Sequence, residues 1–308
     1  MQVPPWPPEG RLTPMHLTAA SELPLRALST LFARAFEGYF VTVPDAPVLF
    51  DARVRTEHIS LEDSRVARVE GEPVGLVLMA RRGRVSRVAG MGVLPVWRNR
   101  RLGGAMLRPL MDEARARGDA RMVLEVIEQN APAVALYTRL GFQRVRRLVG
   151  FSGALGPESA ESTPALVAVG KGDFARPLPE GLPTSELEEV DPGECARLLP
   201  EGLPWQLAPA TVAGLSLPAR AFRLGPAVAV LADIAAPSLG LRALGVAAEA
   251  RGQGAGRRLL HALAARWPGK PFTVSAVVPE DRSARFFEKA GFTQTALTQL
   301  ELALSFAP

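Results

Sequence analysis

The 308-residue chain has very few of the residues that form disulfides or transition-metal sites. Its one cysteine, Cys195, has no partner for a disulfide within the chain. The three histidines, His16, His58 and His261, are far apart and lack the short spacing of metal ligands. We therefore predict no metal centre.

Long apolar runs and targeting signals are missing as well. No stretch of about 18 apolar residues is present that could span a bilayer. The proline-rich segment 1–14 lacks the apolar stretch after a basic start that marks a signal peptide. These absences predict a cytoplasmic protein with no membrane partner, and the chain length fits two domains.

Lysine is rare, so almost all of the positive charge comes from arginine. Only Lys171, Lys270 and Lys289 occur in a chain of net charge +5. Arginine suits bidentate phosphate contacts, which fits a polyanionic cofactor, although genome composition produces the same bias. There is no basic tail and no interleaving of aromatic and basic residues, so we predict no nucleic-acid partner.

The first half contains a loop that is suited to a phosphate group. Apolar spacing predicts one or two helices within 15–40, and strands at 66–69, 74–80 and 85–93. An arginine- and glycine-rich loop then leads into an amphipathic helix that begins near Leu102. A helix N-terminus has unpaired N–H groups that attract phosphate, and glycine allows close approach of a ligand. The pattern therefore predicts a pyrophosphate site.

A second motif follows the strand predicted at 122–127. A short helix from Ala133 to Leu140 is predicted to end at Gly141. Asn130 is placed to cap this helix, and Tyr137, seven residues later, lies on the same side two turns further on.

In this order and spacing, the two motifs resemble the GNAT superfamily of acyl-CoA N-acyltransferases across about residues 14–150. The first is a loop of the type Arg-x-x-Gly-x-Gly, and the second reads Asn-x-x-Ala-x-x-Leu-Tyr-x-x-x-Gly-Phe. Arg98 and Gly103 match the first motif, whereas Arg101 stands in place of its first glycine. The resemblance implies acetyl-CoA as the acyl donor. It also implies a primary amine as the acceptor, either a small molecule or a peptide N-terminus, and a monomer or homodimer.

The resemblance also assigns residues to the cosubstrate. The end of the third strand would bind the pantetheine arm, the loop and helix start the pyrophosphate, and the second motif the rest of the cosubstrate. These residues are Met91, Gly92, Val93, Arg98, Asn99, Arg100, Arg101, Leu102, Gly103, Gly104, Asn130 and Ala133.

Two residues are candidates for the chemistry that the resemblance implies. Tyr137 would be the acid that protonates the leaving thiolate, and Glu125, twelve residues earlier, would be the base. Ribosomal-protein alanine acetyltransferases have a similar Leu-Glu-Val strand, with the glutamate as base at the matching place.

Each of these residues also has a purely structural interpretation. Tyr137 could be a packed aromatic, and Glu125 could face solvent between two buried neighbours on its strand. Asn130 would be a helix cap in either case, and the arginines could belong to a solvated loop. Tyr39 could line an acceptor pocket, but we expect a core aromatic.

The second half repeats the first imperfectly. Arg251, Gly254 and Gly256 complete the loop signature, but Phe287 and Ser275 stand at the places of the tyrosine and the glutamate. Phenylalanine has no proton to donate. This copy is thus predicted to bind acyl-CoA, or to stabilise the first copy, without chemistry by this route. Its predicted cosubstrate-binding residues are Val246, Arg251, Gly252, Gly254 and Gly256.

This internal repeat predicts an α/β (α+β) fold of two tandem GNAT-like domains. Each would contain a mixed, mostly antiparallel twisted sheet flanked by helices. The predicted limits are 1–170, a linker at 171–184, and 185–308, with strands at 148–154 and 165–169 completing the first domain. The predicted function is N-acyl transfer in the first domain. The alternative is an acyl-CoA-binding regulatory or scaffold protein without turnover, which has no need of both Glu125 and Tyr137.

Overall fold

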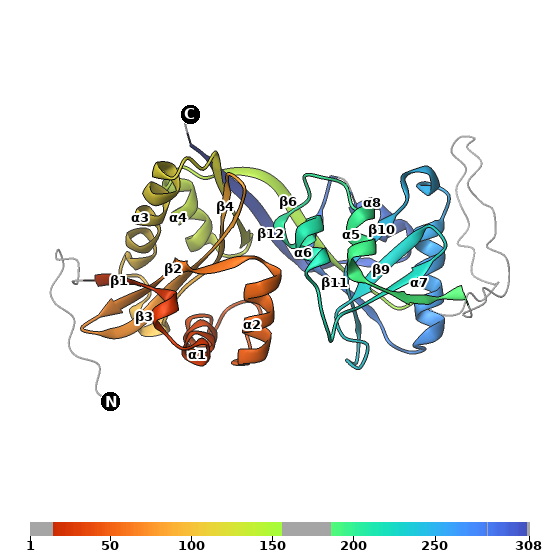
Figure 1. Cartoon of the computed structure of the whole chain (residues 1–308), viewed down its shortest axis with the longest axis horizontal. Coiled ribbons are helices and arrows are strands. Elements are labelled where there is room, and N and C mark those ends of the chain that lie inside the picture. Colours follow the sequence, from red (N-terminus) through yellow and green to blue (C-terminus); the bar gives the residue numbers. More distant parts are fainter. Residues whose placement is uncertain (1–14, 156–185, 282, 307–308) are drawn as a thin grey trace. The chain divides into compact units, whose positions relative to one another are not determined.

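The computed structural model describes residues 15–155, 186–281 and 283–306. The chain forms two compact units (Figure 1): the first comprises Met1–Arg147 with Gln299–Pro308, and the second comprises Leu148–Thr298. The linker predicted at 171–184 and the strand predicted at 165–169 lie outside the described residues. The predicted domain limits therefore stay a prediction.

The first unit is a mixed sheet with helices on both faces. Its strand order is β1-β2-β3-β4-β5-β12. β4 and β5 run parallel, and the other neighbouring pairs are antiparallel. Along the chain its elements are β1 (Met15–Ala19), η1 (Ala20–Glu22), α1 (Leu25–Ala35), α2 (Pro47–Thr56), β2 (Ile59–Val69), β3 (Glu72–Arg82), β4 (Val85–Val93), η2 (Pro95–Trp97), α3 (Leu102–Ala116), β5 (Arg121–Ile127) and α4 (Ala131–Arg139).

Most of these elements agree with those predicted from the sequence, but the elements at the start of the unit differ from the prediction. The two predicted hairpins are confirmed, with their turns at Gly71 and Gly83 in the left-handed region. The helix expected from residue 15 begins at Leu25 instead, because Met15–Ala19 pairs with β2 as an edge strand. The sequence pattern gave no sign of helix α2.

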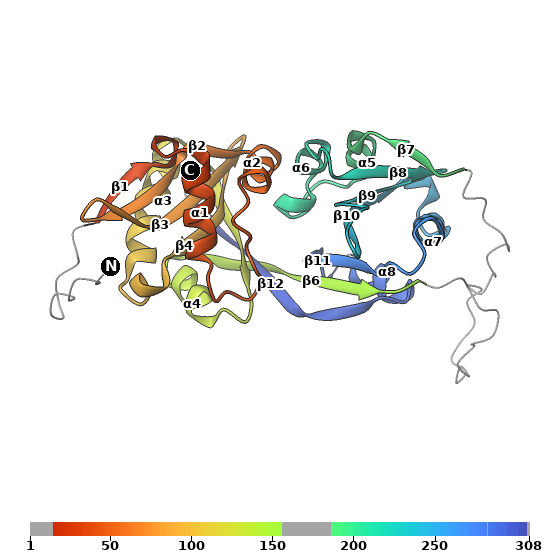
Figure 2. The same ribbon diagram turned by 90° about the horizontal axis from the view of Figure 1, so that it is seen from below.

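The helices of the first unit divide between the two faces of its sheet. The core under α3 and α4 contains Met106 and Leu107 of α3, together with Leu124 and Val126 of β5. On the other face α1 lies along β3 and β4 (Figure 2), and a Cβ added at Gly92 would be 2.9 Å from Ala35. Successive residues of β4 therefore face different helix layers.

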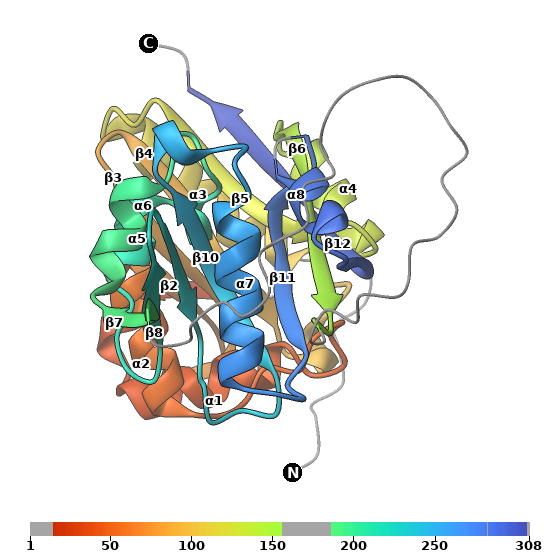
Figure 3. The ribbon, with the colours of Figure 1, turned by 90° about the vertical axis from the view of Figure 1, so that its right-hand side faces the viewer.

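The second unit repeats this arrangement. Its strand order is β6-β11-β10-β9-β8-β7, with β10 and β11 parallel. α7 packs against β8, β9 and β10 (Figure 3). The elements that follow α4 along the chain are β6 (Gln143–Gly153), β7 (Glu188–Val190), α5 (Pro192–Leu198), η4 (Trp205–Leu207), α6 (Pro209–Ala213), β8 (Arg220–Leu224), β9 (Ala227–Leu231), β10 (Leu239–Val246), η5 (Ala248–Ala250), α7 (Ala255–Arg266), β11 (Phe272–Pro279), α8 (Ala284–Lys289) and β12 (Thr293–Ser305).

The repeat predicted from the sequence is confirmed by the order of elements. In the first unit a strand, a 3-10 turn, a helix, a parallel strand and a short helix follow one another from β4 to α4. The same five elements recur from β10 to α8. The fold is therefore the predicted tandem α/β arrangement.

Two strands pair with partners that the sequence did not predict. Residues 148–153 of β6, expected in the first domain, pair with β11 of the second unit. Residues 299–305 of β12, at the end of the chain, pair with β5 of the first unit. An apolar run predicts a strand but not its partner, so this exchange is not visible in the sequence. Each sheet needs a strand from the opposite half of the chain.

Candidate active site

The loop before α3 has the same backbone conformation as its counterpart before α7. Asn99 and Arg101 have φ angles of 63° and 61°, and Gly252 and Gly254 have 77° and 78°. Arg101, where the signature has glycine, therefore adopts the left-handed conformation that glycine favours. The loop keeps its path despite the replacement, at a cost of about 1–2 kcal/mol.

Both helices begin without a capping side chain among the described residues. The N-cap positions are Arg101 in α3 and Gly254 in α7, and neither makes a side-chain cap bond. The first N–H groups of a helix have no partner inside it, and they carry a partial positive charge. Both loops are therefore suited to an anionic group such as a pyrophosphate.

The last glycine of each signature lies close to neighbouring side chains. A Cβ added at Gly103 would be 2.9 Å from a methyl group of Leu136 on α4. A Cβ added at Gly256 would be 3.2 Å from Leu244 and from Phe286 on α8. In the first unit this glycine lets α3 approach α4, and in the second unit it lets α7 approach α8.

The arginine that opens the first signature turns back onto its own unit. Arg98 Nη2 donates to the carbonyl oxygens of Ala35 at 3.0 Å and Glu37 at 2.7 Å, and its Nε donates to Val93 at 3.2 Å. Its amide donates to the carbonyl of Pro95. The side chain thus ties the end of α1 to the end of β4, a role that neither sequence interpretation considered.

The second unit uses its own arginine in the same way. Arg251 donates to the carbonyl oxygens of Val246 at 3.0 Å and Leu198 at 3.1 Å, which joins the end of β10 to the end of α5. The neighbouring arginine of the first loop behaves differently, since Arg100 stacks on the ring of Trp97 at 4.7 Å.

Tyr137 is almost fully buried on α4. It is 7% exposed, and its ring packs edge-on against Phe142 at 5.9 Å. Burial raises the pKa of the phenol well above its usual range, and nearby Tyr39 raises it further. A phenol is protonated at neutral pH with or without this shift, so the hydroxyl has a proton to donate. Packing and acid chemistry are compatible at this position.

Tyr39 contacts the start of the second motif in the folded structure. It follows α1, is half-buried, and hydrogen-bonds with the Asn130 side chain and the backbone at Ile127. Burial raises the pKa of its phenol. We expected a core aromatic, but Tyr39 is only half-buried, and its ring packs edge-on against Phe36 at 5.0 Å and Phe40 at 5.4 Å.

Asn130 caps α4, as predicted. Its side-chain oxygen accepts a hydrogen bond from the amide of Ala133 at 3.3 Å. The cap and the bond to Tyr39 hold the segment between β5 and α4 against the segment that follows α1. Two segments that are far apart in sequence therefore meet at Tyr39 and Asn130.

Glu125 belongs to a group of buried charges, so the alternative in which its side chain faces solvent does not hold. Its carboxylate accepts from Arg87 at 2.8 Å, and the two side chains are 3% and 1% exposed. Arg87 also donates to Glu57 at 2.5 Å, and Arg53 donates to Glu57 at 3.1 Å. These ion pairs connect α2, β4 and β5. The sequence did not indicate them, although Arg87 is a charged residue inside an apolar strand.

Glu57 and Arg87 hold each other in the ionised form. Burial alone would raise the pKa of Glu57, but Arg53 and Arg87 lower it to about 2. Burial would lower the pKa of Arg87, but Glu125 and Glu57 raise it above its usual value. At neutral pH the arginine is therefore a cation with a carboxylate on each side.

A third carboxylate reaches this region from β12. Glu301 on β12 is the register partner of Glu125 on β5. Burial raises its pKa, Glu125 adds to the increase, and Arg146, at 2.5 Å, opposes it. The end of the chain therefore shapes the electrostatic environment of the candidate base, which the repeat in the sequence did not show.

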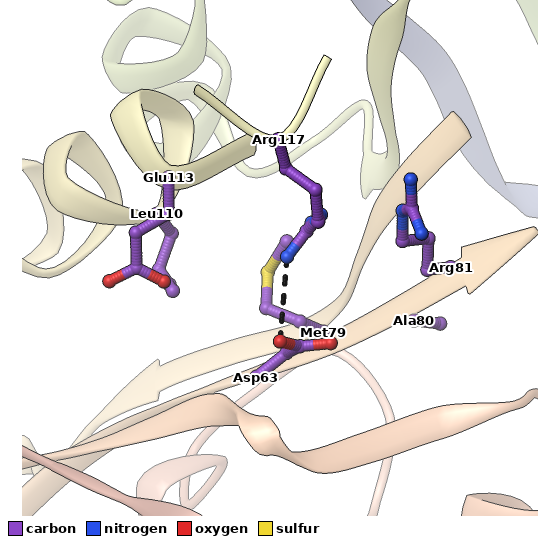
Figure 4. A pocket seen from close by; sticks show the side chains of 7 residues that line it. All are labelled: Asp63, Met79, Ala80, Arg81, Leu110, Glu113 and Arg117. Atoms are coloured by element: carbon purple, nitrogen blue, oxygen red, sulfur yellow. Dashed lines mark hydrogen bonds and ion pairs between the residues drawn. The ribbon is translucent and has the colours of Figure 1, made fainter. Parts of the chain in front are cut away.

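A small pocket elsewhere in the first unit is too small for a substrate. Figure 4 shows it between β3 and the last turns of α3, next to the ion pair of Asp63 with Arg117 at 3.4 Å. Its volume is about 10 Å³. A space of this size holds about one water molecule. It also lies at the opposite end of α3 from the signature loop.

Within the described ranges, no helix is long and apolar enough to cross a membrane. The same residues contain no group of three or more histidine, cysteine, aspartate or glutamate side chains arranged to hold a metal ion.

Comparison with known proteins identifies the family. The Acetyltransferase (GNAT) family model matches residues 25–142, and an Acetyltransferase (GNAT) domain model matches residues 224–294. The N-alpha-acetyltransferase RimI of Mycobacterium tuberculosis is 32% identical over 148 residues, which cover 46% of this chain and 88% of the relative.

Solved structures share the fold of the whole chain. A GCN5-related N-acetyltransferase from Sphaerobacter thermophilus has a TM-score of 0.60 at 14% identity, over 96% of each chain. A tandem GNAT protein from the clavulanic acid biosynthesis pathway has a TM-score of 0.59 at 16% identity, over 96% of this chain and 99% of that chain.

The chain belongs to the GNAT family of acetyltransferases. It is an acyl-CoA-dependent N-acetyltransferase with acetyl-CoA as its cosubstrate.

Replacing Arg101 by glycine is expected to stabilise the protein. Removing a left-handed side chain gains about 1–2 kcal/mol, and the extra freedom of glycine in the unfolded chain costs about 0.5–1 kcal/mol. Thermal unfolding should show a Tm increase of about 1–4 °C. Arg100→Gly is the control, because it relieves no strain and removes the contact with Trp97. A lower Tm for Arg101→Gly would contradict this account.

Glu57 should make stability depend on acidic pH. Its pKa falls from 4.5 to about 2 on folding, so its contribution is complete above pH 4.5 and is lost as pH falls toward 2. The loss is about 3 kcal/mol, measured as the free energy of unfolding in urea. Glu57→Gln should flatten this part of the pH profile. Glu113→Gln, which breaks the exposed pair with Arg65, should change stability by under about 1 kcal/mol. Equal pH profiles for Glu57→Gln and the unsubstituted chain would refute the assignment.

Proposed function

We propose that the first unit transfers the acetyl group of acetyl-CoA to a primary amine by direct attack. Tyr137 protonates the leaving thiolate, and Glu125 accepts the proton of the amine. The position of Tyr137 carries the proposal. It is a buried phenol, held protonated, where the second motif meets the segment that follows α1.

The residues around this position fit the cosubstrate. The uncapped start of α3, from Leu102 to Gly104, is suited to the pyrophosphate. β4 pairs with β5 over Val85–Val88 and then continues to Val93. The strand end beyond this ladder, residues 91–93, offers backbone groups to an extended arm. The bound cosubstrate supplies an activated thioester carbonyl.

Glu125 is the carboxylate of the first unit that lies on β5, the strand before the second motif. Its side chain is held in place by an ion pair with Arg87 at 2.8 Å. Because the side chain is 3% exposed, we place a water molecule between the amine and the carboxylate. Glu301 on β12 stands opposite Glu125 in the register of the two strands.

The acceptor is a primary amine, and the N-terminus of a peptide is the first to test. The Mycobacterium tuberculosis relative is an N-alpha-acetyltransferase, and it aligns with 46% of this chain. A panel of short peptides with free α-amines, compared with small amines and amino acids, distinguishes the two acceptor classes. Failure of every amine to release CoA from acetyl-CoA would favour a binding protein without turnover.

Removing the hydroxyl of Tyr137 should abolish most turnover and leave binding intact. General acid catalysis contributes about 10²–10⁴-fold, so Tyr137→Phe should lower kcat by about 100-fold or more with any accepted amine. The ring and its packing remain, so the Kd for acetyl-CoA should change less than about threefold. Thiol release and calorimetric titration measure the two quantities.

Tyr39→Phe is the matched control for this experiment, since it removes the other phenol of the site. We expect a smaller effect on kcat, because Tyr39 bonds with Asn130 and the Ile127 backbone. Unchanged kcat in Tyr137→Phe, or a larger loss in Tyr39→Phe, would exclude Tyr137 as the acid.

A further inference from the structure

Helix α2 is tied to β4 by two charged side chains at its C-terminal end. Arg53 Nη2 donates to the backbone carbonyl oxygen of Ala89, and its Nε donates to Glu57 at 3.1 Å. Glu57, the C-cap residue of α2, accepts from Arg87 on β4 at 2.5 Å. The side chains of Glu57 and Arg87 are 11% and 1% exposed, so little water competes for this ion pair. The end of α2 therefore has a fixed position over β4.

Arg87 extends this constraint to Glu125 on β5. Its Nε and Nη2 both contact the Oε2 atom of Glu125 at 2.8 Å, while its Nη1 contacts Glu57. One rigid, planar guanidinium is thus shared by two carboxylates, so the position of each carboxylate depends on the other. Because the arginine is buried, little water is available to replace a contact that it gives up.

The second unit has none of these three side chains at the matching places. Counted back from the last residue of each strand, Gly240 on β10 stands at the place of Arg87 on β4. Ser275 stands at the place of Glu125, and α6, the second α-helix of its unit, has Gly214 as its C-cap where α2 has a glutamate. The same arrangement of elements therefore forms without these charges. They are present in the unit that contains the candidate acid and absent from the unit that lacks it.

We propose that α2 holds the carboxylate of Glu125 in position for the reaction, with Glu57 and Arg87 as the positioning residues. This rests on the proposed function, in which Glu125 accepts the proton of the amine. A displacement of about 1 Å in a reacting group can cost about 100-fold in rate, so a base needs a rigid support. Loosening either contact should lower kcat and leave the binding of both substrates unchanged.

Glu57→Gln and Arg87→Lys test the proposal in the full chain at neutral pH, each alone and each combined with Glu125→Gln. The first removes a charge and keeps the side-chain shape, whereas the second keeps the charge and removes the fork that spans two carboxylates. Each alone should lower kcat about tenfold, with the KM for acetyl-CoA and for the amine within about twofold of the unsubstituted values. Glu125→Gln alone should lower kcat about 100-fold, and neither second substitution should lower it further.

The combined variants separate a positioning role from a general loss of stability. Losses of kcat that multiply in the double variants would overturn the positioning role, because each residue would then act independently of Glu125. A raised KM at unchanged kcat would overturn it as well. Unchanged kcat in Glu125→Gln would contradict the proposed function itself, and the positioning role with it.

Arg81→Lys is the matched control, since Arg81 pairs with the buried carboxylate of Asp119 at 2.8 Å in the same unit, beside the small pocket of Figure 4. It should lower the Tm and leave kcat unchanged. An equal loss of kcat in Arg81→Lys and Arg87→Lys would overturn the proposal. Thermal unfolding checks that each protein is folded, and the Glu57→Gln pair of variants decides the outcome if Arg87→Lys does not fold.

Discussion

The uncapped start of a helix, presented by two left-handed residues, is the feature on which the rest of the structure depends. It leaves a row of N–H groups directed out of α3 and of α7, and a polyanion is the natural partner for such a row. Gly103 and Gly256 let each helix approach the short helix of the second motif. The approach of α3 to α4 brings the uncapped start of α3 and Tyr137 into one region of the first unit.

The exchange of strands explains why neither half of the chain is independent. β12 supplies the strand beside β5, and with it Glu301 opposite Glu125. β6 supplies the strand beside β11. The second half therefore contributes to the first unit's site even though Phe287 removes the candidate acid from its own copy. A repeat that has lost this residue still completes the sheet of the other copy, which is a structural reason to retain it.

The sequence predicted features that depend on local order along the chain. The hairpins, the α3 and α7 helix starts and the Asn130 cap follow from residue spacing and turn chemistry, and the structure has them. Features that depend on tertiary contacts were beyond it. The side chains of Arg98 and Arg251 bond to carbonyl groups at the ends of other elements, Glu125 pairs with Arg87 across two strands, and β12 joins the first sheet. None of these contacts has a signature in spacing alone.

The location of the chemistry is the central claim, and one comparison of turnover tests it most directly. Acetyl-CoA and an accepted amine are supplied to Gly103→Glu and to Gly256→Glu, with thermal unfolding as a check on both proteins. Each glutamate adds a negative charge at the start of a cradle helix. Turnover should be lost in Gly103→Glu and retained in Gly256→Glu. Retention in the first and loss in the second would place the chemistry in the second unit and contradict the assignment of Tyr137 and Glu125.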